Sequence, residues 1–302
     1  GWRHARTGPK GRPFEEKFQV LGCSLDLAGV PQGEVTLENK PGRLDRLCEH
    51  FQRIKAAGTM TLHEAQILHG LLRYACGFFA GKHLHQVCAE VMSLGSASGR
   101  NKMAALSNFC DYACDMLAKC VPRTLSAFGE RKPVLIFTDG CWEGGRAGIG
   151  AVVIDTALGT KQVFVGEVPP QLISAWAQQV GDQLICQIEL YAMVVLRWML
   201  RQQLAHRRSI WWVDNEAARF SVIKGMSPSA TMKCLARAFY SFEVESPTCS
   251  WVERVPSYSN IADGPSRAQP EEAMFLLGVQ ACCNFDHPND LLALLLANQL
   301  VI

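Results

Sequence analysis

The sequence predicts an α/β fold, in which a mixed five-stranded sheet flanked by helices is preceded by a mainly helical domain. From residue 134 onward, strand-like apolar runs come first in quick succession and then alternate with helical patterns. Between residues 40 and 128, apolar residues instead recur at helical spacing. A polar stretch at 129–133, closed by a proline, is predicted as the linker between these two parts. The length of 302 residues and the hydrophobic content of 48% suggest two compact domains.

The part before the linker is predicted to contain a strand-pair region at 1–39 and the helical domain at 40–128. Two apolar runs at 18–22 and 33–37 flank a turn-rich stretch and read as the strand pair. Thr61 and Glu64 have the spacing of a capping box, which predicts a helix start. The predicted helices cover 43–54, 61–74, about 83–94 and 101–120.

The part after the linker is predicted as the α/β domain at 134–268, followed by an apolar helical tail at 269–302. Its first three strands follow one another closely, which predicts an antiparallel meander. In the tail, the apolar run at 291–296 predicts a packed helix and is too short to span a bilayer. The predicted strands are 134–138, 148–154, 162–166, 210–213 and 251–255, and the predicted helices are about 185–204, one from 216, and 232–242.

Composition excludes little by itself. A net charge of +2 is too small to indicate a class of partner, and the thirteen cysteines show no paired CxxC spacing. We therefore predict reduced thiols. No segment approaches the roughly 18 uncharged apolar residues needed to span a membrane, and the first residues lack a signal peptide's apolar core, so we also predict a soluble intracellular protein, cytoplasmic or nuclear, with no membrane partner. His83, His85 and Cys88 are close enough to suggest a metal site, but without a second ligand pair they are interpreted as packing residues. Because the chain begins with Gly1, we expect a fragment of a longer polypeptide.

Four acidic residues stand at the ends of predicted elements. Asp139 follows the strand at 134–138, Asp214 follows 210–213, and Asp263 comes after 251–255, whereas Glu189 lies near the start of a long amphipathic helix and is aimed at the sheet. Each acid alone could be an N-cap or an exposed strand end. Together at one edge of a sheet they would repel one another strongly unless a divalent cation neutralised them, so they predict a metal site suited to phosphodiester hydrolysis.

Four sequence blocks carry a family resemblance. They are Thr138-Asp139-Gly140, residues 187–192 (QIELYA), residues 213–218 (VDNEAA) and residues 255–267 (VPSYSNIADGPSR). In this order they resemble the successive blocks of a retroelement ribonuclease H domain, over about residues 133–267. Upstream, residues 17–22 are similar to the strand that leaves the palm of a reverse transcriptase, and residues 68–75 to a thumb or connection helix. The chain thus resembles the C-terminal part of a retrotransposon reverse transcriptase.

The resemblance implies endonucleolytic hydrolysis of the RNA strand of RNA–DNA hybrids by a two-metal mechanism. Asp139, Glu189, Asp214 and Asp263 would bind two Mg²⁺ ions, and Mn²⁺ would be able to replace them. The polymerase half of the same polypeptide would be a partner, but no Tyr-x-Asp-Asp element occurs, so no polymerase activity is expected. Many ribonucleases H place a histidine on the loop before the last aspartate, where it assists proton transfer or product release. No histidine lies between Trp251 and Asp263 in this chain, so the activity is predicted to be slow.

The nucleic-acid contacts are also implied by the resemblance. Gly140, Cys141, Asn215 and Ser257 would face the RNA strand, and Asn260 would brace the loop before Asp263. Lys224, Lys233 and Arg237 lie where the family often contacts DNA phosphates, although a solvated helix face explains them equally well.

The main alternative is a catalytically inert, ribonuclease H-like module that binds nucleic acid or has a structural role. Proofreading exonucleases and integrases share the sheet architecture. Both fit less well. A proofreading exonuclease would have Asp-x-Glu on the first strand, whereas this chain has Asp139-Gly140-Cys141. An integrase would have a glutamate as its last acid, whereas the matching acid here is Asp263. The sequence predicts no oligomeric state.

Overall fold

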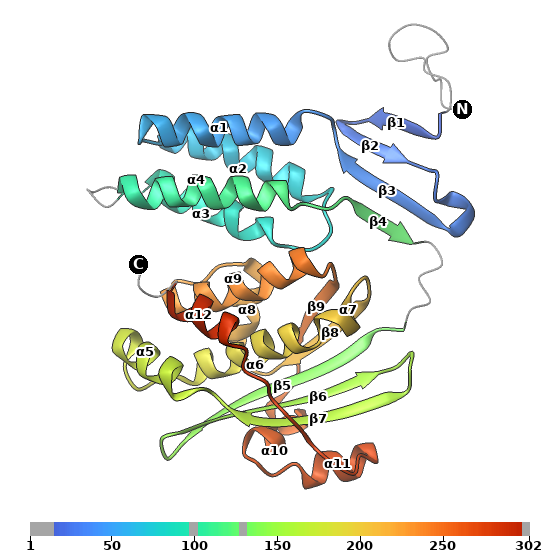
Figure 1. Cartoon of the computed structure of the whole chain (residues 1–302), viewed down its shortest axis with the longest axis vertical. Coiled ribbons are helices and arrows are strands. Elements are labelled where there is room, and N and C mark those ends of the chain that lie inside the picture. The colour runs from blue at the N-terminus through green and yellow to red at the C-terminus, as the bar shows by residue number, and fades with distance from the viewer. Residues whose placement is uncertain (1–14, 97–101, 127–131, 298–302) are drawn as a thin grey trace, which may run out of the picture.

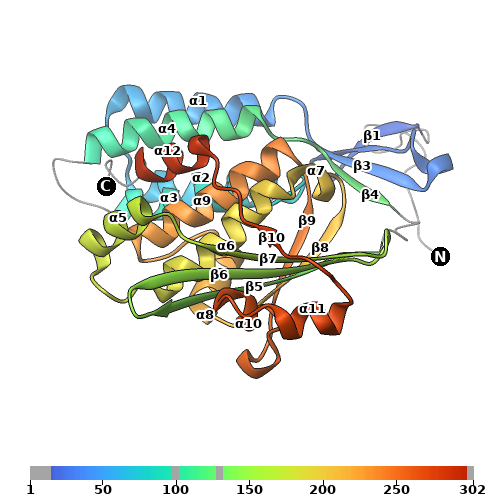
Figure 2. The same cartoon turned by 60° about the horizontal axis from the view of Figure 1, so that its bottom comes forward.

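A computed structural model describes residues 15–96, 102–126 and 132–297. Its elements form stacked layers (Figures 1 and 2). A bundle of α1–α4 with a small sheet, β1–β4, lies at one end, and next to it lies a layer that contains α6, α8, α9 and α12. A second sheet follows, and α10 and α11 cover its far side. The predicted linker at 129–133 falls largely outside the described residues.

The small sheet has four antiparallel strands in the order β1-β2-β3-β4, rather than one strand pair. Leu21 and Gly22, both with positive φ, turn the chain sharply, so the predicted strand at 18–22 ends early and β2 begins directly after it. β4 arrives from beyond the helices and pairs with β3, a contact that local periodicity does not reveal. The strands are β1 (Lys17–Val20), β2 (Cys23–Asp26), β3 (Glu34–Asn39) and β4 (Arg123–Ser126).

The four predicted helices of the first part are confirmed. The Thr61 hydroxyl accepts from the backbone N–H of Glu64 at 3.2 Å, and the Glu64 carboxylate accepts from the N–H of Thr61 at 2.8 Å, which completes the capping box. Buried apolar side chains such as Phe51, Leu72 and Leu106 form a core between the helices. The helices are α1 (Arg43–Ala57), α2 (Leu62–Cys76), α3 (Leu84–Ser96) and α4 (Lys102–Ala118).

The second sheet has the order β10-β7-β6-β5-β8-β9. The antiparallel meander of β5, β6 and β7 is confirmed, and β8 and β9 continue the sheet in parallel with β5. This is the α/β class and the mixed sheet that the sequence predicts, with a sixth strand, β10, added at the edge. The strands are β5 (Val134–Glu143), β6 (Arg146–Asp155), β7 (Thr160–Glu167), β8 (Arg208–Val213), β9 (Cys249–Arg254) and β10 (Cys283–Asn284).

The helices on one face of this sheet are centred on α6, which is buried over most of its length. The predicted helix at 185–204 is divided at Leu200 into α6 and α7. Sequence reasoning missed α5, which begins at Pro170, because a proline pair reads as a loop although proline is well suited to the first turn of a helix. The helices are α5 (Pro170–Val180), α6 (Ile185–Met199), α7 (Arg201–Leu204), α8 (Glu216–Lys224) and α9 (Ala230–Glu245).

The C-terminal segment wraps around the edge of the sheet. α10 (Asp263–Ser266) and α11 (Glu271–Leu277) lie on the face opposite α6, and β10 then covers the edge of β7. α12 (Asn289–Ala297), the helix predicted from the apolar tail, packs against α5 and α9. All thirteen cysteines are free. Within the described residues, no helix has the length and apolar character needed to cross a membrane.

The helical bundle packs against α9 through polar contacts. The backbone N–H of Lys82 donates to the buried carboxylate of Glu243 at 2.9 Å. Glu90 on α3 binds Lys233 at 3.4 Å and Arg237 at 2.7 Å. The two parts of the chain are therefore held together by specific charged groups.

Candidate metal centre

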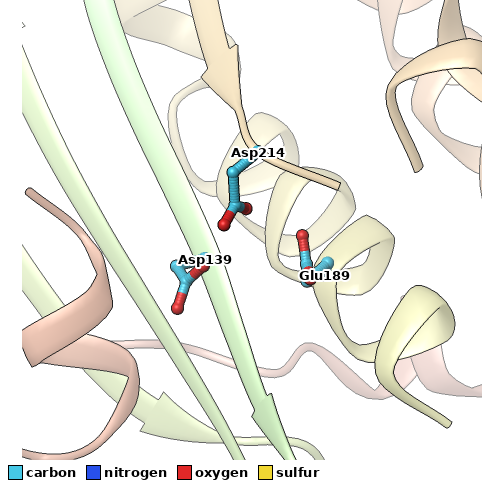
Figure 3. Close-up of side chains that lie close together, drawn as sticks. All are labelled: Asp139, Glu189 and Asp214. Atoms are coloured by element: carbon cyan, nitrogen blue, oxygen red, sulfur yellow. The ribbon is translucent and has the colours of Figure 1, made fainter. Parts of the chain in front are cut away.

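Three of the four predicted acids meet where two parallel strands diverge. β5 and β8 pair only as far as Phe137 and Trp212, and Asp139 and Asp214 lie just beyond that point. Asp139 does not end its strand, as the sequence suggested, because β5 continues to Glu143. Glu189 reaches the same place from the second turn of α6. One carboxylate oxygen from each of the three acids lies within 4.8 Å of the others, and the side chains converge in Figure 3.

A glycine allows α6 to approach β5 this closely. A Cβ at Gly140 would lie 2.8 Å from both the Cγ and the backbone nitrogen of Glu189. Any side chain at this position would push α6 away from the strand. Gly140 therefore sets the spacing between Asp139 and Glu189, and its contact with RNA stays a prediction.

Burial raises the pKa of two of the carboxylic acids in the cluster above the usual range of such groups. Asp139 and Glu189 have exposed fractions of 4% and 6%. Burial is the main cause that raises the pKa of Asp139 to about 7, with the nearby charges of Asp214 and Asp263 adding to the shift and the Ser266 hydroxyl opposing it. Burial likewise raises the pKa of Glu189 to about 9, with Asp214 and Asp139 adding to it.

Two oxygen atoms of the cluster have no hydrogen-bond partner. They are Oε2 of Glu189 and Oδ1 of Asp214, and both are shielded from solvent. Buried polar atoms are almost always paired, so two unpaired carboxylate oxygens in one cluster call for an explanation. A hard divalent cation would satisfy both the charge and the lone pairs, since such cations prefer oxygen ligands. The cluster fits a divalent metal ion.

Neighbouring side chains hold the carboxylates in place. The Asn215 amide donates to Glu189 at 3.1 Å, and the Asn260 amide donates to Asp139 at 3.3 Å and to the Thr138 carbonyl at 3.1 Å. The hydroxyl of Ser266, which is fully buried, lies 2.6 Å from the second oxygen of Asp139. Sequence reasoning assigned no role to Ser266, although it lies within the block at 255–267.

The short helix α10 is positioned by glycines of β6. A Cβ at Gly148 would lie 2.0 Å from the Ser266 carbonyl oxygen, and one at Gly150 would lie 2.3 Å from its backbone nitrogen. The absence of side chains there lets α10 lie directly on the strand, beside Asp139. This packing links Asp139 to the segment that begins with Asp263.

Asp263 lies outside the group of three. Its side chain is 49% exposed and its Oδ1 accepts from Nε of Arg267 at 3.1 Å. It is close enough to influence the pKa of Asp139. Its role as a metal ligand remains a prediction.

The predicted nucleic-acid contacts separate into two groups. Ser257 and Lys224 are exposed, and the Lys224 ammonium lies 5.1 Å from the ring centre of Phe220. The other predicted residues are engaged within the protein: Asn215 and Asn260 by the carboxylates, Lys233 and Arg237 by Glu90, and Cys141 by burial beside Arg267.

Neither a scan of protein-family models nor a search of curated proteins gives a match. Several solved structures resemble part of the fold. LC11-RNase H1, isolated from compost by a metagenomic approach, is 18% identical with a TM-score of 0.37, over 47% of this chain and 98% of that chain. RNase H1 from Halobacterium salinarum NRC-1 is 15% identical with a TM-score of 0.33, over 48% and 98%. The N-terminal RNase H domain of a Mycobacterium tuberculosis protein is 18% identical with a TM-score of 0.32, over 48% and 97%. These values are too low to indicate an activity, which is inferred from the site itself.

Proposed function

We propose that this chain hydrolyses the RNA strand of RNA–DNA hybrids in a reaction that depends on divalent metal ions. The observation that carries the proposal is the convergence of Asp139, Glu189 and Asp214, of which one carboxylate oxygen each lies within 4.8 Å of the others. Glu189 and Asp214 each also keep a buried oxygen without a partner. The choice of RNA–DNA hybrid as substrate comes from the sequence blocks around these acids, which resemble a retroelement ribonuclease H domain.

Each residue of the site has a defined part. Asp139, Glu189 and Asp214, joined by Asp263, would hold two Mg²⁺ ions. Bound there, the cations would activate a water molecule for attack on the phosphate and stabilise the departing 3′ oxygen. Asn215, Asn260 and Ser266 orient the carboxylates, so less reorganisation is needed when a metal binds. The exposed Ser257 and Lys224 would contact the substrate backbone.

The proposed context is the C-terminal part of a retroelement reverse transcriptase. In that arrangement the bundle of α1–α4 would be a thumb or connection region, and a polymerase half would precede it. The order of the sequence blocks supports this assignment, and the polar contacts between the bundle and α9 would keep the two regions in a fixed relation.

The test is cleavage of an end-labelled RNA strand annealed to DNA in the presence of Mg²⁺ or Mn²⁺. Single-stranded RNA and duplex DNA serve as substrate controls, and Asp214→Asn serves as the protein control. We expect cleavage of the hybrid alone, lost in the variant. Hybrid binding without cleavage by the wild-type chain would instead support an inert ribonuclease H-like module.

A further inference from the structure

A network of three charged side chains lies at the rim of the acid cluster. Nε of Arg267 donates to Asp263 at 3.1 Å, and Nη1 donates to Glu143 in a close ion pair. Nη1 also lies 3.9 Å from the Cys141 sulfur. Arg267 therefore connects the end of β5 to the start of α10.

Two of the residues that Arg267 contacts lie on β5, on the same face as Asp139. Asp139, Cys141 and Glu143 alternate along the strand and so share one face of it. Asp139 belongs to the convergent cluster, and Arg267 spans the other two positions. The guanidinium thus supplies positive charge beside the acid cluster.

Arg267 can also reach solvent. Its side chain is 40% exposed, and no described residue binds its Nη2. A guanidinium has five N–H donors in a planar fork, so those on Nη2 remain free for an oxyanion. Arginine is well suited to a phosphate for the same reason.

We propose that Arg267 acts as an internal counter-ion for Asp263 in the metal-free protein and, once a divalent cation takes Asp263, binds a backbone phosphate of the substrate. Glu143 keeps the guanidinium at the rim in both states. This inference rests on the proposed function and assigns Arg267 a binding site for phosphate that the acid cluster alone does not provide.

The proposal requires effects of opposite sign. An arginine that competes with the metal for Asp263 weakens metal binding, so its removal should tighten it. An arginine that binds phosphate strengthens substrate binding, so its removal should weaken it. An arginine that only stabilises the fold would produce neither pattern.

The experiment compares the whole chain with Arg267→Ala, Arg267→Gln and Arg267→Lys. Mn²⁺ affinity is measured without nucleic acid, from the electron paramagnetic resonance signal of free Mn²⁺. We expect roughly threefold to tenfold tighter Mn²⁺ binding in the two neutral variants and little change in Arg267→Lys. The KM for hybrid should rise roughly threefold to tenfold in the neutral variants. The slope of log affinity against log salt concentration should become shallower by the amount that about one phosphate contact contributes.

Arg219→Ala is the matched control, because Arg219 also bridges two carboxylates, Glu216 and Glu253, on α8 and β9. It should leave both Mn²⁺ affinity and KM unchanged. Unchanged or weaker Mn²⁺ binding in folded Arg267→Ala and Arg267→Gln would overturn the counter-ion role, and an unchanged KM would overturn the phosphate contact. A wild-type chain that binds Mn²⁺ but leaves the hybrid intact would overturn the proposed function, while the Mn²⁺ affinities would still decide the counter-ion role.

Discussion

The two ends of the large sheet carry buried acids in opposite states. At one end, Asp155 closes β6 and its fully buried carboxylate is bound by the Arg207 guanidinium, by the Gln203 amide at 3.3 Å and by the backbone N–H of Leu158 at 3.0 Å. The Arg207 hydrogen bond holds the pKa of Asp155 well below its usual range. At the other end, Asp139 and Glu189 are also buried, but their pKa values are raised to about 7 and about 9.

This contrast shows that burial alone does not identify a functional acid. Asp155 is satisfied entirely by the protein and has no need of an ion. Glu189 and Asp214 each keep a buried oxygen without a partner. Such atoms are costly unless something outside the chain satisfies them, so the unpaired carboxylate oxygens fit a divalent cation at these acids.

The largest expected effect is the loss of cleavage when an acid of the cluster is substituted, compared with substitution of Asp155. Asp214→Asn should reduce hybrid cleavage by more than roughly a hundredfold. Loss of a residue that only supports a metal ligand costs up to about a hundredfold, and loss of a ligand itself should cost more. Asp155→Asn should leave the cleavage rate of the folded protein unchanged. It should lower the free energy of unfolding by about 3–5 kcal/mol, because Arg207 loses its partner. Cleavage assays and urea unfolding of both variants check this pair. A similar loss of cleavage in both would show that the two acids do not differ in function.

A buried hydroxyl at each end gives the next prediction. Ser266→Ala removes the donor to Asp139 and should reduce cleavage by roughly tenfold to a hundredfold, with weaker Mg²⁺ binding. The control is Ser209→Ala on β8, a buried serine that contacts Ser250 at 3.3 Å and accepts from Trp211 at 3.0 Å. That variant should lose stability without losing activity. Equal activity of the two variants would show that Ser266 does not position Asp139.

The pH dependence of stability should also distinguish the two ends. Without metal, the folded protein keeps protons on Asp139 and Glu189 at pH values where the unfolded chain has released them. The contribution of these two groups to the free energy of unfolding is therefore fully present below about pH 4 and falls as pH rises, by about 1.4 kcal/mol per pH unit for each retained proton. The fall ends near the folded-state values of about 7 for Asp139 and about 9 for Glu189.

Urea unfolding between about pH 5 and pH 7 measures this slope. In Asp139→Asn the change in the free energy of unfolding per pH unit should be more positive than in the wild type by about 1.4 kcal/mol, because one group with a raised pKa is gone. Glu243, whose pKa burial also raises, contributes equally to both proteins and cancels in the comparison. Identical slopes would mean that Asp139 does not hold a proton in the folded state.

The smallest effect extends the comparison from acids to cations. Arg237 is paired with Glu90, whereas no described carboxylate pairs with Lys224. Lys224→Ala should weaken hybrid binding and make the slope of log affinity against log salt concentration shallower by the amount that about one phosphate contact contributes. Arg237→Ala should leave that salt dependence unchanged and lower stability by about 1 kcal/mol. Titrations of a labelled hybrid at several salt concentrations test both, and a reduced salt dependence in Arg237→Ala would restore it as a phosphate contact.

The sequence predicted the location of the acids better than their surroundings. Asp139 and Asp214 follow apolar runs whose strand character is local, so their meeting at one sheet edge could be predicted. Ser266 contacts Asp139 across 127 residues, and Glu90 contacts Arg237 across 147, so neither contact has a local signal. The same reason explains the missed pairing of β4 with β3 and of β10 with β7.

The most direct test of the metal centre is thermal unfolding with and without Mg²⁺ for the wild type, Glu189→Gln and Asp155→Asn. A ligand that binds only the folded state raises its stability, by about 1.4 kcal/mol at tenfold excess over the dissociation constant. We expect Mg²⁺ to raise the unfolding temperature of the wild type and of Asp155→Asn by about 2 °C or more, and to leave that of Glu189→Gln nearly unchanged. An equal rise in Glu189→Gln, or no rise in the wild type, would contradict a metal site at these acids.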